Sequence, residues 1–390
     1  MILRTCKLPK KNSFFLFGPR GSGKSTLLQS EYSEDDSIFL DLLDVQLLDD
    51  LMIDAGRFEQ MINARGSEEK RVIIDEIQKF PRLLDLVQKQ IQRHKRQFIL
   101  TGSSARKLKQ SGTNLLAGRA WLLHLYPFTA NELADRFDLK LALERGTLPD
   151  AYLASQDSDA REYLLAYVAN YLEKEIQQER WVRNLVPFRR FLAIAAQMNG
   201  KIINHLAIAR EVGVNDVTVA NYFEILEDTL LGFQLPAFHK SVRKAQKQAP
   251  KFYFIDPGIK RALDRSLSVD LLPQTYAWGD AFEHWVILEI FKNASYDRLD
   301  WEFSFLRTKD DLEIDLIIDR PGQPPVLVEI KSKQRVQESD TKSLQLLGPD
   351  IHRNPESFLL SMDPLEARFG KVRALRWDHG LDVIFGREHS

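Results

Sequence analysis

The chain has 390 residues, more than one hydrophobic core usually supports, so we expect two or three domains. Hydrophobic residues make up 44% of it and charged residues 28%, which excludes a largely disordered chain. The formal net charge of -1 excludes a strong overall attraction to nucleic acid, so any such contact requires a local basic patch.

Short apolar runs in residues 14–127 predict an α/β fold built on a parallel sheet. Each run ends at a small or polar residue and helical stretches separate the runs, which is typical of parallel strands covered by helices. The expected strands are Phe14–Phe17, Ile38–Leu40, Val72–Ile74 and Phe98–Leu100.

A phosphate-loop pattern, GPRGSGKS, lies between the first expected strand and a helical run. Its backbone amides would surround a β-phosphate, Lys24 would reach the β- and γ-phosphates, and the Ser25 hydroxyl would hold Mg²⁺. The pattern therefore predicts ATP and Mg²⁺ as cofactors. The expected nucleotide contacts are Gly18, Pro19, Arg20, Gly21, Ser22, Gly23, Lys24, Ser25 and Thr26.

Other strand ends carry groups that ATP hydrolysis needs. Asp75 and Glu76 end an apolar run, and we expect Asp75 to bind Mg²⁺ and Glu76 to act on the attacking water. Thr101 and Ser103 end the next run as candidate sensors of the γ-phosphate, although capping of the next helix is an alternative. Arg119 is a candidate arginine finger for a neighbouring subunit of a homo-oligomer, and a surface arginine explains it equally well.

The middle of the chain predicts helices. Residues 128–200 are expected to form a helical connector or lid, because apolar side chains recur there at helical spacing. A helix at Leu206–Glu211, a turn at Gly213 and a second helix from Asp216 predict a helix-turn-helix. Strands expected at Phe233–Phe238 and Lys251–Ile255 would complete a winged helix.

No acidic residue lies between Asp228 and Asp256, where the wing is expected. The cations of this segment predict contact with the phosphates of forked, duplex or branched DNA. A solvated loop beside a structural winged helix is the alternative, which acidic residues such as Glu224 and Glu227 on the second helix favour. The predicted DNA contacts are Lys240, Arg243, Lys244, Lys247 and Lys251.

The C-terminal part predicts one helix and a strand meander with acids and a lysine in a set order. Glu283 lies on the helix, Asp315 on an expected strand, and Glu329 and Lys331 on another strand, where alternation places both on one face. This order resembles the PD-(D/E)xK nuclease core. The resemblance implies that Asp315 and Glu329 bind Mg²⁺ or Mn²⁺, that Glu283 supports the site, and that Lys331 orients water or stabilises charge. Charged strand ends that face solvent are the alternative.

The chain as a whole resembles bacterial and archaeal AAA+ ATPases that carry a C-terminal domain of formerly unknown function. Beyond the phosphate loop, the resemblance rests on IIDEIQ (73–78), LTGSS (100–104), LAGR (116–119), YPF (126–128), NYFEILEDT (221–229) and KFYFIDPG (251–258). It implies an ATPase engine and leaves the cellular role open.

These patterns predict an AAA+ P-loop ATPase domain at 1–127, a helical connector at 128–200, a winged-helix domain at 201–270 and a restriction-endonuclease-like α/β domain at 271–390. The leading hypothesis is a Mg²⁺-dependent ATPase that couples hydrolysis to binding, remodelling or cleaving DNA. The alternatives are an ATP-dependent switch or scaffold for protein partners, with an inactive nuclease-like domain, and a nuclease gated by ATP. One cysteine and no apolar run near the roughly 18 residues of a membrane span favour a cytoplasmic protein without membrane contact.

Overall fold

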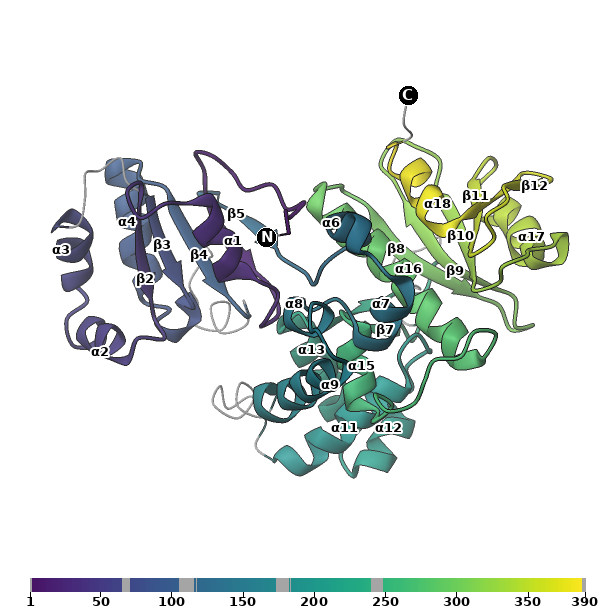
Figure 1. Ribbon diagram of the computed structural model, residues 1–390, viewed down its shortest axis with the longest axis horizontal. Coiled ribbons are helices and arrows are strands. Elements are labelled where there is room, and N and C mark those ends of the chain that lie inside the picture. Colours follow the sequence, from purple (N-terminus) through teal and green to yellow (C-terminus); the bar gives the residue numbers. More distant parts are fainter. Residues whose placement is uncertain are drawn as a thin grey trace.

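The computed structural model describes residues 2–64, 71–104, 116, 118–172, 182, 184–239 and 248–387. Within them the chain forms an α/β unit, a helical middle part and a second, mixed-sheet unit (Figure 1). The N-terminus lies where these parts meet (Figure 1). The predicted α/β fold class is therefore confirmed.

The N-terminal unit is a five-stranded parallel sheet in the order β2-β3-β4-β1-β5. Its inner strands read as continuous apolar runs because helices cover both faces, and every residue of β1 and β4 is buried. The strands are β1 (Ser13–Phe17), β2 (Ser37–Asp41), β3 (Arg71–Asp75), β4 (Phe98–Gly102) and β5 (Ala120–His124). The helices are α1 (Lys24–Glu31), α2 (Val45–Ile53), α3 (Arg57–Ala64) and α4 (Leu83–His94).

The sequence did not single out β5, the edge strand beside β1. Its Trp121 and Leu122 are 45% and 51% exposed, so the strand lacks the buried apolar run that marks the other four. Pairing with β1 holds it in the sheet, with Phe14 beside Trp121.

The middle part is largely helical, as predicted. Its helices are α6 (Ala130–Leu133), α7 (Leu139–Arg145), α8 (Pro149–Tyr152), α9 (Asp157–Ala166), α11 (Leu185–Gln197), α12 (His205–Val212), α13 (Asp216–Asp228) and α15 (Pro257–Leu263). Residues Tyr167–Leu172 continue α9 as a π-helix. Between α13 and α15, the strands β6 (Gly232–Leu235) and β7 (Lys251–Phe254) form an antiparallel pair.

The C-terminal unit is a six-stranded mixed sheet in the order β12-β13-β11-β10-β9-β8. The long helix α16 (Tyr276–Tyr296) precedes it and runs back toward the N-terminal unit (Figure 1). The strands are β8 (Glu302–Arg307), β9 (Glu313–Asp319), β10 (Val326–Lys331), β11 (Glu356–Ser361), β12 (Ala367–Phe369) and β13 (Val372–Arg376), and the helices are α17 (Lys342–Ile351) and α18 (Trp377–Ile384).

The three parts share cores rather than standing apart. One apolar cluster joins Phe14 of β1 and Leu27 of α1 to Phe191 and Phe223 of the helical part. Aromatic stacking of Phe233 on Phe291 fixes the β6 strand against α16, with the ring centroids 4.0 Å apart. None of the helices in the described residues combines the length and apolarity that a membrane crossing needs.

Candidate functional site

The phosphate loop joins β1 to α1 in a conformation that requires glycine. Gly21 and Gly23 have φ values of +73° and +90°, in the left-handed region that other residues rarely adopt. The Ser22 amide donates to the Pro19 carbonyl at 3.2 Å and closes the turn, and α1 begins directly after Gly23. The first amides of α1 therefore open toward the loop, which is the arrangement that holds an anion at a helix N-terminus.

Lys24 points back into this loop. Its side chain is buried, and its Nζ donates to the carbonyls of Gly18 at 2.8 Å and Pro19 at 3.2 Å. The buried Ser22 hydroxyl has no partner among the described atoms. The loop thus combines a buried ammonium group, a hydroxyl without a partner and the backbone amides of its glycines. These groups fit a triphosphate.

The acidic end of β3 lies beside the start of α1. Ser25 Oγ donates to Asp75 Oδ2 at 2.8 Å, and Thr101 Oγ1 donates to the other oxygen, Asp75 Oδ1. A hydroxyl and a carboxylate at hydrogen-bond distance are the ligand types through which P-loop proteins hold Mg²⁺. Thr101 thus orients Asp75, a role that the sequence did not suggest beside contact with the γ-phosphate or helix capping.

Glu76 follows in a left-handed conformation, φ +57°, and is held by Gln78. Burial raises the pKa of Glu76, and the nearby Lys24 ammonium partly offsets this. Gln78 Nε2 donates to Glu76 Oε2 and, at 3.3 Å, to Ser103 Oγ, so it connects the two strand ends. Gln78 belongs to a motif of the sequence, but the motif alone indicates no role for it.

Arg119 does not approach the phosphate loop of its own chain. It immediately precedes β5, whose first residue, Ala120, pairs with Ser13 at the start of β1. The phosphate loop follows the opposite end of β1, about 15 Å away along a five-residue strand. Any action of Arg119 on a nucleotide would therefore have to be on a neighbouring subunit.

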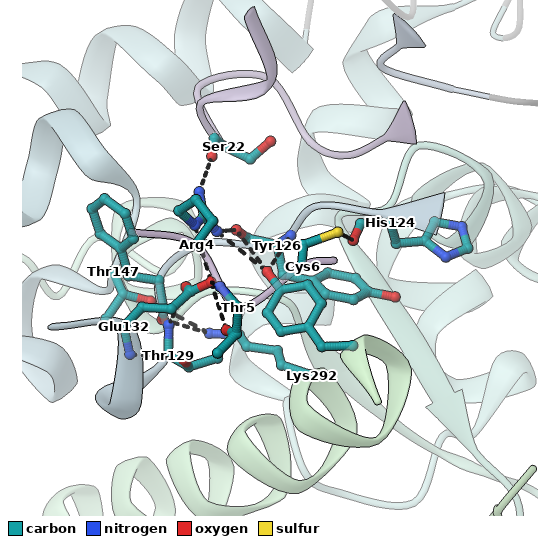
Figure 2. A network of polar contacts seen from close by, with 12 residues as sticks. Arg4, Thr5, Cys6, Ser22, His124, Tyr126, Thr129, Glu132, Thr147 and Lys292 are labelled. Atoms are coloured by element: carbon teal, nitrogen blue, oxygen red, sulfur yellow. Dashed lines mark hydrogen bonds and ion pairs between the residues drawn. The ribbon is translucent and has the colours of Figure 1, made fainter. Parts of the chain in front are cut away.

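Arg4 connects the phosphate loop to the rest of the molecule, and sequence reasoning missed it. Figure 2 shows its guanidinium between Ser22, Tyr126 and Glu132. Nη1 donates to the Ser22 carbonyl at 2.7 Å, Nη2 to the Tyr126 carbonyl at 2.6 Å, and Nε to Glu132 Oε1 at 3.1 Å. Nη2 also lies 3.2 Å from the hydroxyl of Tyr296, the last residue of α16.

The pKa of Arg4 reflects this setting. Burial would lower it, but Tyr296 and Glu132 outweigh burial and raise the pKa, so the guanidinium stays charged. Glu132 is fully buried and also accepts hydrogen bonds from Thr5 and Thr129. No sequence signal marks Arg4, because its partners are distant in the chain.

A second contact on the loop comes from the helical connector. A Cβ atom added to Gly21 would lie 2.5 Å from the hydroxyl oxygen of Tyr163 on α9. Burial raises the pKa of Tyr163 to about 12, so its hydroxyl stays protonated. The connector therefore packs directly against the phosphate loop.

The acids of the C-terminal unit gather where β9 and β10 meet. Asp315 is buried and its Oδ2 accepts from the Ile330 amide at 2.7 Å. Lys331 Nζ lies 2.6 Å from Glu329 Oε1, so the two side chains share one face of β10. Burial, followed by the charge of Glu329, holds the pKa of Asp315 well above its usual range, and burial also raises the pKa of Glu329.

Glu283 is linked to this site by Tyr253 and Lys251 of β7, two contacts that the sequence did not predict. Tyr253 donates to Glu283 Oε1 at 2.8 Å, and Lys251 Nζ lies 3.5 Å from the same oxygen and 2.5 Å from Glu313 Oε1. Burial would lower the pKa of Lys251, but Glu283 and Glu313 raise it overall. The site thus contains a second lysine.

The fit of a metal to this site rests on two carboxylates. No group of three or more His, Cys, Asp or Glu side chains is placed to hold a metal ion in the part of the chain that the structure describes. Glu329 Oε2 is nevertheless buried without a hydrogen-bond partner. A buried, unpaired carboxylate oxygen next to Asp315 suits a divalent cation whose remaining ligands are water or substrate oxygens.

The predicted DNA-binding wing requires one correction. Lys251 is only 3% exposed and is held by Glu283 and Glu313, so it does not present its charge to a DNA phosphate. The sequence showed its charge but not the burial of β7 against the C-terminal unit. Lys240, Arg243, Lys244 and Lys247 lie outside the described residues.

Comparisons with known proteins divide the chain in three. The AAA domain family matches residues 10–134. A domain of unknown function (DUF8612) matches residues 136–270, and another (DUF4143) matches residues 278–377.

Relatives are found in bacteria and archaea. Uncharacterized proteins of Mycobacterium bovis and Mycobacterium tuberculosis are each 26% identical over 314 residues, 79% of this chain and 68% of the relative. An uncharacterized protein of Methanocaldococcus jannaschii is 27% identical over 312 residues, 67% of this chain and 64% of the relative.

One similar solved structure is the Thermococcus gammatolerans assembly of McrB AAA+ hexamers with bound McrC. It is 10% identical, with a TM-score of 0.26, over 69% of this chain and 80% of that chain. Residues 10–134 match the AAA domain family and carry a phosphate loop with Lys24 and Ser25 in place.

Proposed function

We propose that this protein is a Mg²⁺-dependent ATPase that couples hydrolysis to action on DNA. The observation that carries the ATPase is the meeting of Ser25, Asp75 and Thr101 beside the buried ammonium of Lys24. In this arrangement Lys24 would neutralise phosphate charge, while Ser25 and Asp75 would hold the magnesium ion, which stabilises the charge that develops on the transferred phosphoryl group.

Glu76 is the proposed general base. It would accept a proton from the attacking water once released from Gln78, and the neighbouring strand end would position the γ-phosphate through Ser103. Arg119 is proposed to complete the site of an adjacent subunit in a homo-oligomer. Its place just before the start of β5, away from the phosphate loop of its own chain, supports action between subunits over action within one chain.

Coupling would proceed through the two contacts on the loop. Arg4 ties the Ser22 carbonyl to the end of α16, and Tyr163 ties Gly21 to α9. A change of the loop on nucleotide binding would thus reach both the helical part and the C-terminal unit. The proposed units are 1–127, 128–200, 201–270 and 271–390, and the third is a winged helix.

Hydrolysis measured with and without DNA tests this proposal. The wild-type ATPase rate should rise with single-stranded, duplex, forked or four-way DNA and fall steeply with salt, whereas Lys24→Ala should abolish it. A rate that no DNA changes would favour the second candidate, a nucleotide switch that scaffolds protein partners.

DNA cleavage is a separate part of the proposal, supported by the unpaired Glu329 oxygen beside Asp315. Asp315 and Glu329 would hold Mg²⁺ or Mn²⁺, and Lys331 would then leave Glu329 to stabilise charge at the scissile phosphate. Lys331→Ala should stop cleavage and spare ATP hydrolysis. Equal cleavage by this variant and by the wild type would refute the nuclease assignment.

A further inference from the structure

A cavity of about 500 Å³ lies between the N-terminal segment and the end of α16, with the edge strand β5 as its third wall. Its charged and aromatic lining consists of Lys7, Lys10, Lys11, Trp121, Tyr296, Asp297 and Arg298. We call this cavity the N-terminal groove. It is remote from the acids of the C-terminal sheet, because α16 separates its Tyr296 end from Glu283 by more than three helical turns.

The charge of the N-terminal groove is strongly one-sided. Lys7, Lys10 and Lys11 are exposed, and no ion pair holds them among the residues that the structure describes. The acid of the lining, Asp297, is occupied by an ion pair with Arg387. An excess of cations facing one cavity is complementary to a polyanion.

Trp121 adds an aromatic surface to these cations. It projects from β5 with 45% of its surface exposed, although large aromatic side chains are usually buried. The Arg298 guanidinium lies 4.8 Å from the centre of the ring, and its Nη2 donates to the Lys7 carbonyl at 3.0 Å. The Arg298 guanidinium thus covers part of one face of the indole and is anchored to the segment that carries the three lysines.

We propose that the N-terminal groove binds single-stranded nucleic acid, with the lysines on the phosphates and an unpaired base stacked on Trp121. Single-strand-binding surfaces combine a basic track with aromatic platforms, because each base has a stacking face in addition to its phosphate. A duplex hides those faces, and an acidic protein segment would use the lysines without needing the indole. The exposed tryptophan therefore favours a single strand over both.

The N-terminal groove is also connected to the ATP site. Arg4, three residues before Lys7, holds the Ser22 carbonyl, and Tyr296, two residues before Arg298, contacts Arg4. Two walls of the groove thus meet at the side chain that holds the phosphate loop. We expect nucleotide to change the affinity for the strand, and this part alone rests on the proposed ATPase.

Binding is measured by fluorescence anisotropy on the full chain, with a labelled oligo-dT of about 20 nucleotides, longer than the roughly 4–16 that one such module covers. Trp121→Ala should weaken binding about tenfold, while Trp121→Phe, which keeps a stacking ring, should remain within about twofold of the wild type. Lys10→Gln with Lys11→Gln should reduce the salt dependence by about 1.4 in log–log slope, or about 0.7 for each lost phosphate contact.

The control is Lys342→Gln with Lys371→Gln, which removes two exposed lysines of the C-terminal unit and should leave binding unchanged. Thermal unfolding of each variant checks that the fold is kept. Wild-type affinity in the Lys10/Lys11 variant would overturn the proposal. The proposal would also be overturned if poly-glutamate of equal charge displaced the oligonucleotide and Trp121→Ala bound it fully. That result would identify an acidic protein as the occupant.

Lys24→Ala separates this site from the ATPase. Without nucleotide it should bind the oligonucleotide as the wild type does, and with ATP it should lose only the change in affinity. Loss of strand binding by Lys24→Ala without nucleotide would overturn the groove as an independent site, whatever its effect on hydrolysis.

Discussion

Replacing Arg4 by methionine removes the guanidinium and keeps a side chain of similar length. The substitution leaves the fully buried Glu132 without its ion-pair partner and releases the Ser22 and Tyr126 carbonyls. Breaking a buried pair from one side costs about 3–5 kcal/mol, so we expect the free energy of unfolding to fall by an amount in this range. Adding Glu132→Gln removes the stranded charge and should restore about half of the loss.

The effect on ATP distinguishes a positioning role from a structural one. The Ser22 carbonyl belongs to the phosphate loop, and a hydrogen bond from a charged donor contributes about 1.5–3 kcal/mol. Loss of that bond should therefore raise KM for ATP about tenfold or more with a smaller change in kcat, if KM follows nucleotide affinity. Arg4→Lys keeps the charge but cannot reach three acceptors at once, and should lie between the wild type and Arg4→Met.

Steady-state ATPase kinetics and urea unfolding, made on the same preparations, measure both effects. The matched control is Arg387→Met, which removes an arginine bound to Asp297 and Asn293 near the same end of α16 but away from the loop. It should lower stability and leave KM unchanged. If Arg4→Met lowers stability and leaves KM equal to that of the control, Arg4 has no role in positioning the phosphate loop.

Three further predictions follow from other groups. Burial raises the pKa of Glu76, and the hydrogen bond from Gln78 lowers it. The value of kcat should therefore rise with pH as Glu76 ionises, and Gln78→Ala should move that rise to higher pH. Identical pH profiles of the variant and the wild type would contradict this role. Glu289 is a buried residue of α16 that accepts a hydrogen bond from the Ala130 amide. Burial raises the pKa of Glu289 from 4.5 to about 7, so the folded state binds its proton more tightly than the unfolded state. The resulting stabilisation is complete below about pH 4.5 and is lost as pH rises to about 7. Urea unfolding across this range should show a decrease of about 3 kcal/mol that Glu289→Gln flattens, and an unchanged slope would refute the assignment. Mixing inactive Arg119→Ala with inactive Lys24→Ala should restore part of the ATPase if the arginine acts between subunits, whereas no recovery would favour a surface role.

Local patterns in the sequence were sufficient for four of the five strands of the N-terminal sheet. The inner strands are buried on both faces, so each appears as an apolar run with a polar end, and β1 and β4 match their predicted positions within one or two residues. The phosphate loop is equally local, since its glycines, lysine and hydroxyl are adjacent in the chain. The sequence did not predict the strand β5. Its Trp121 and Leu122 are exposed, so its apolar residues do not mark a strand buried on both faces.

Contacts between distant segments could not be predicted in this way. Arg4 meets Glu132 and Tyr296 across 128 and 292 positions of the chain, and nothing near Arg4 indicates either partner. The prediction for Lys251 was wrong, because its charge suggested that it lies on an exposed wing. Only the structure reveals that Glu283 of α16 and Glu313 of β9 pair with this buried lysine.

The most direct test is calorimetric titration of the purified chain with ATP and Mg²⁺, compared with Lys24→Ala. Wild-type protein should bind one nucleotide per chain, with affinity that falls when the metal is omitted, and the variant should lose at least tenfold in affinity because its buried ammonium is gone. The absence of any nucleotide binding by the wild type, or equal binding by both proteins, would contradict a triphosphate held between the phosphate loop and Asp75.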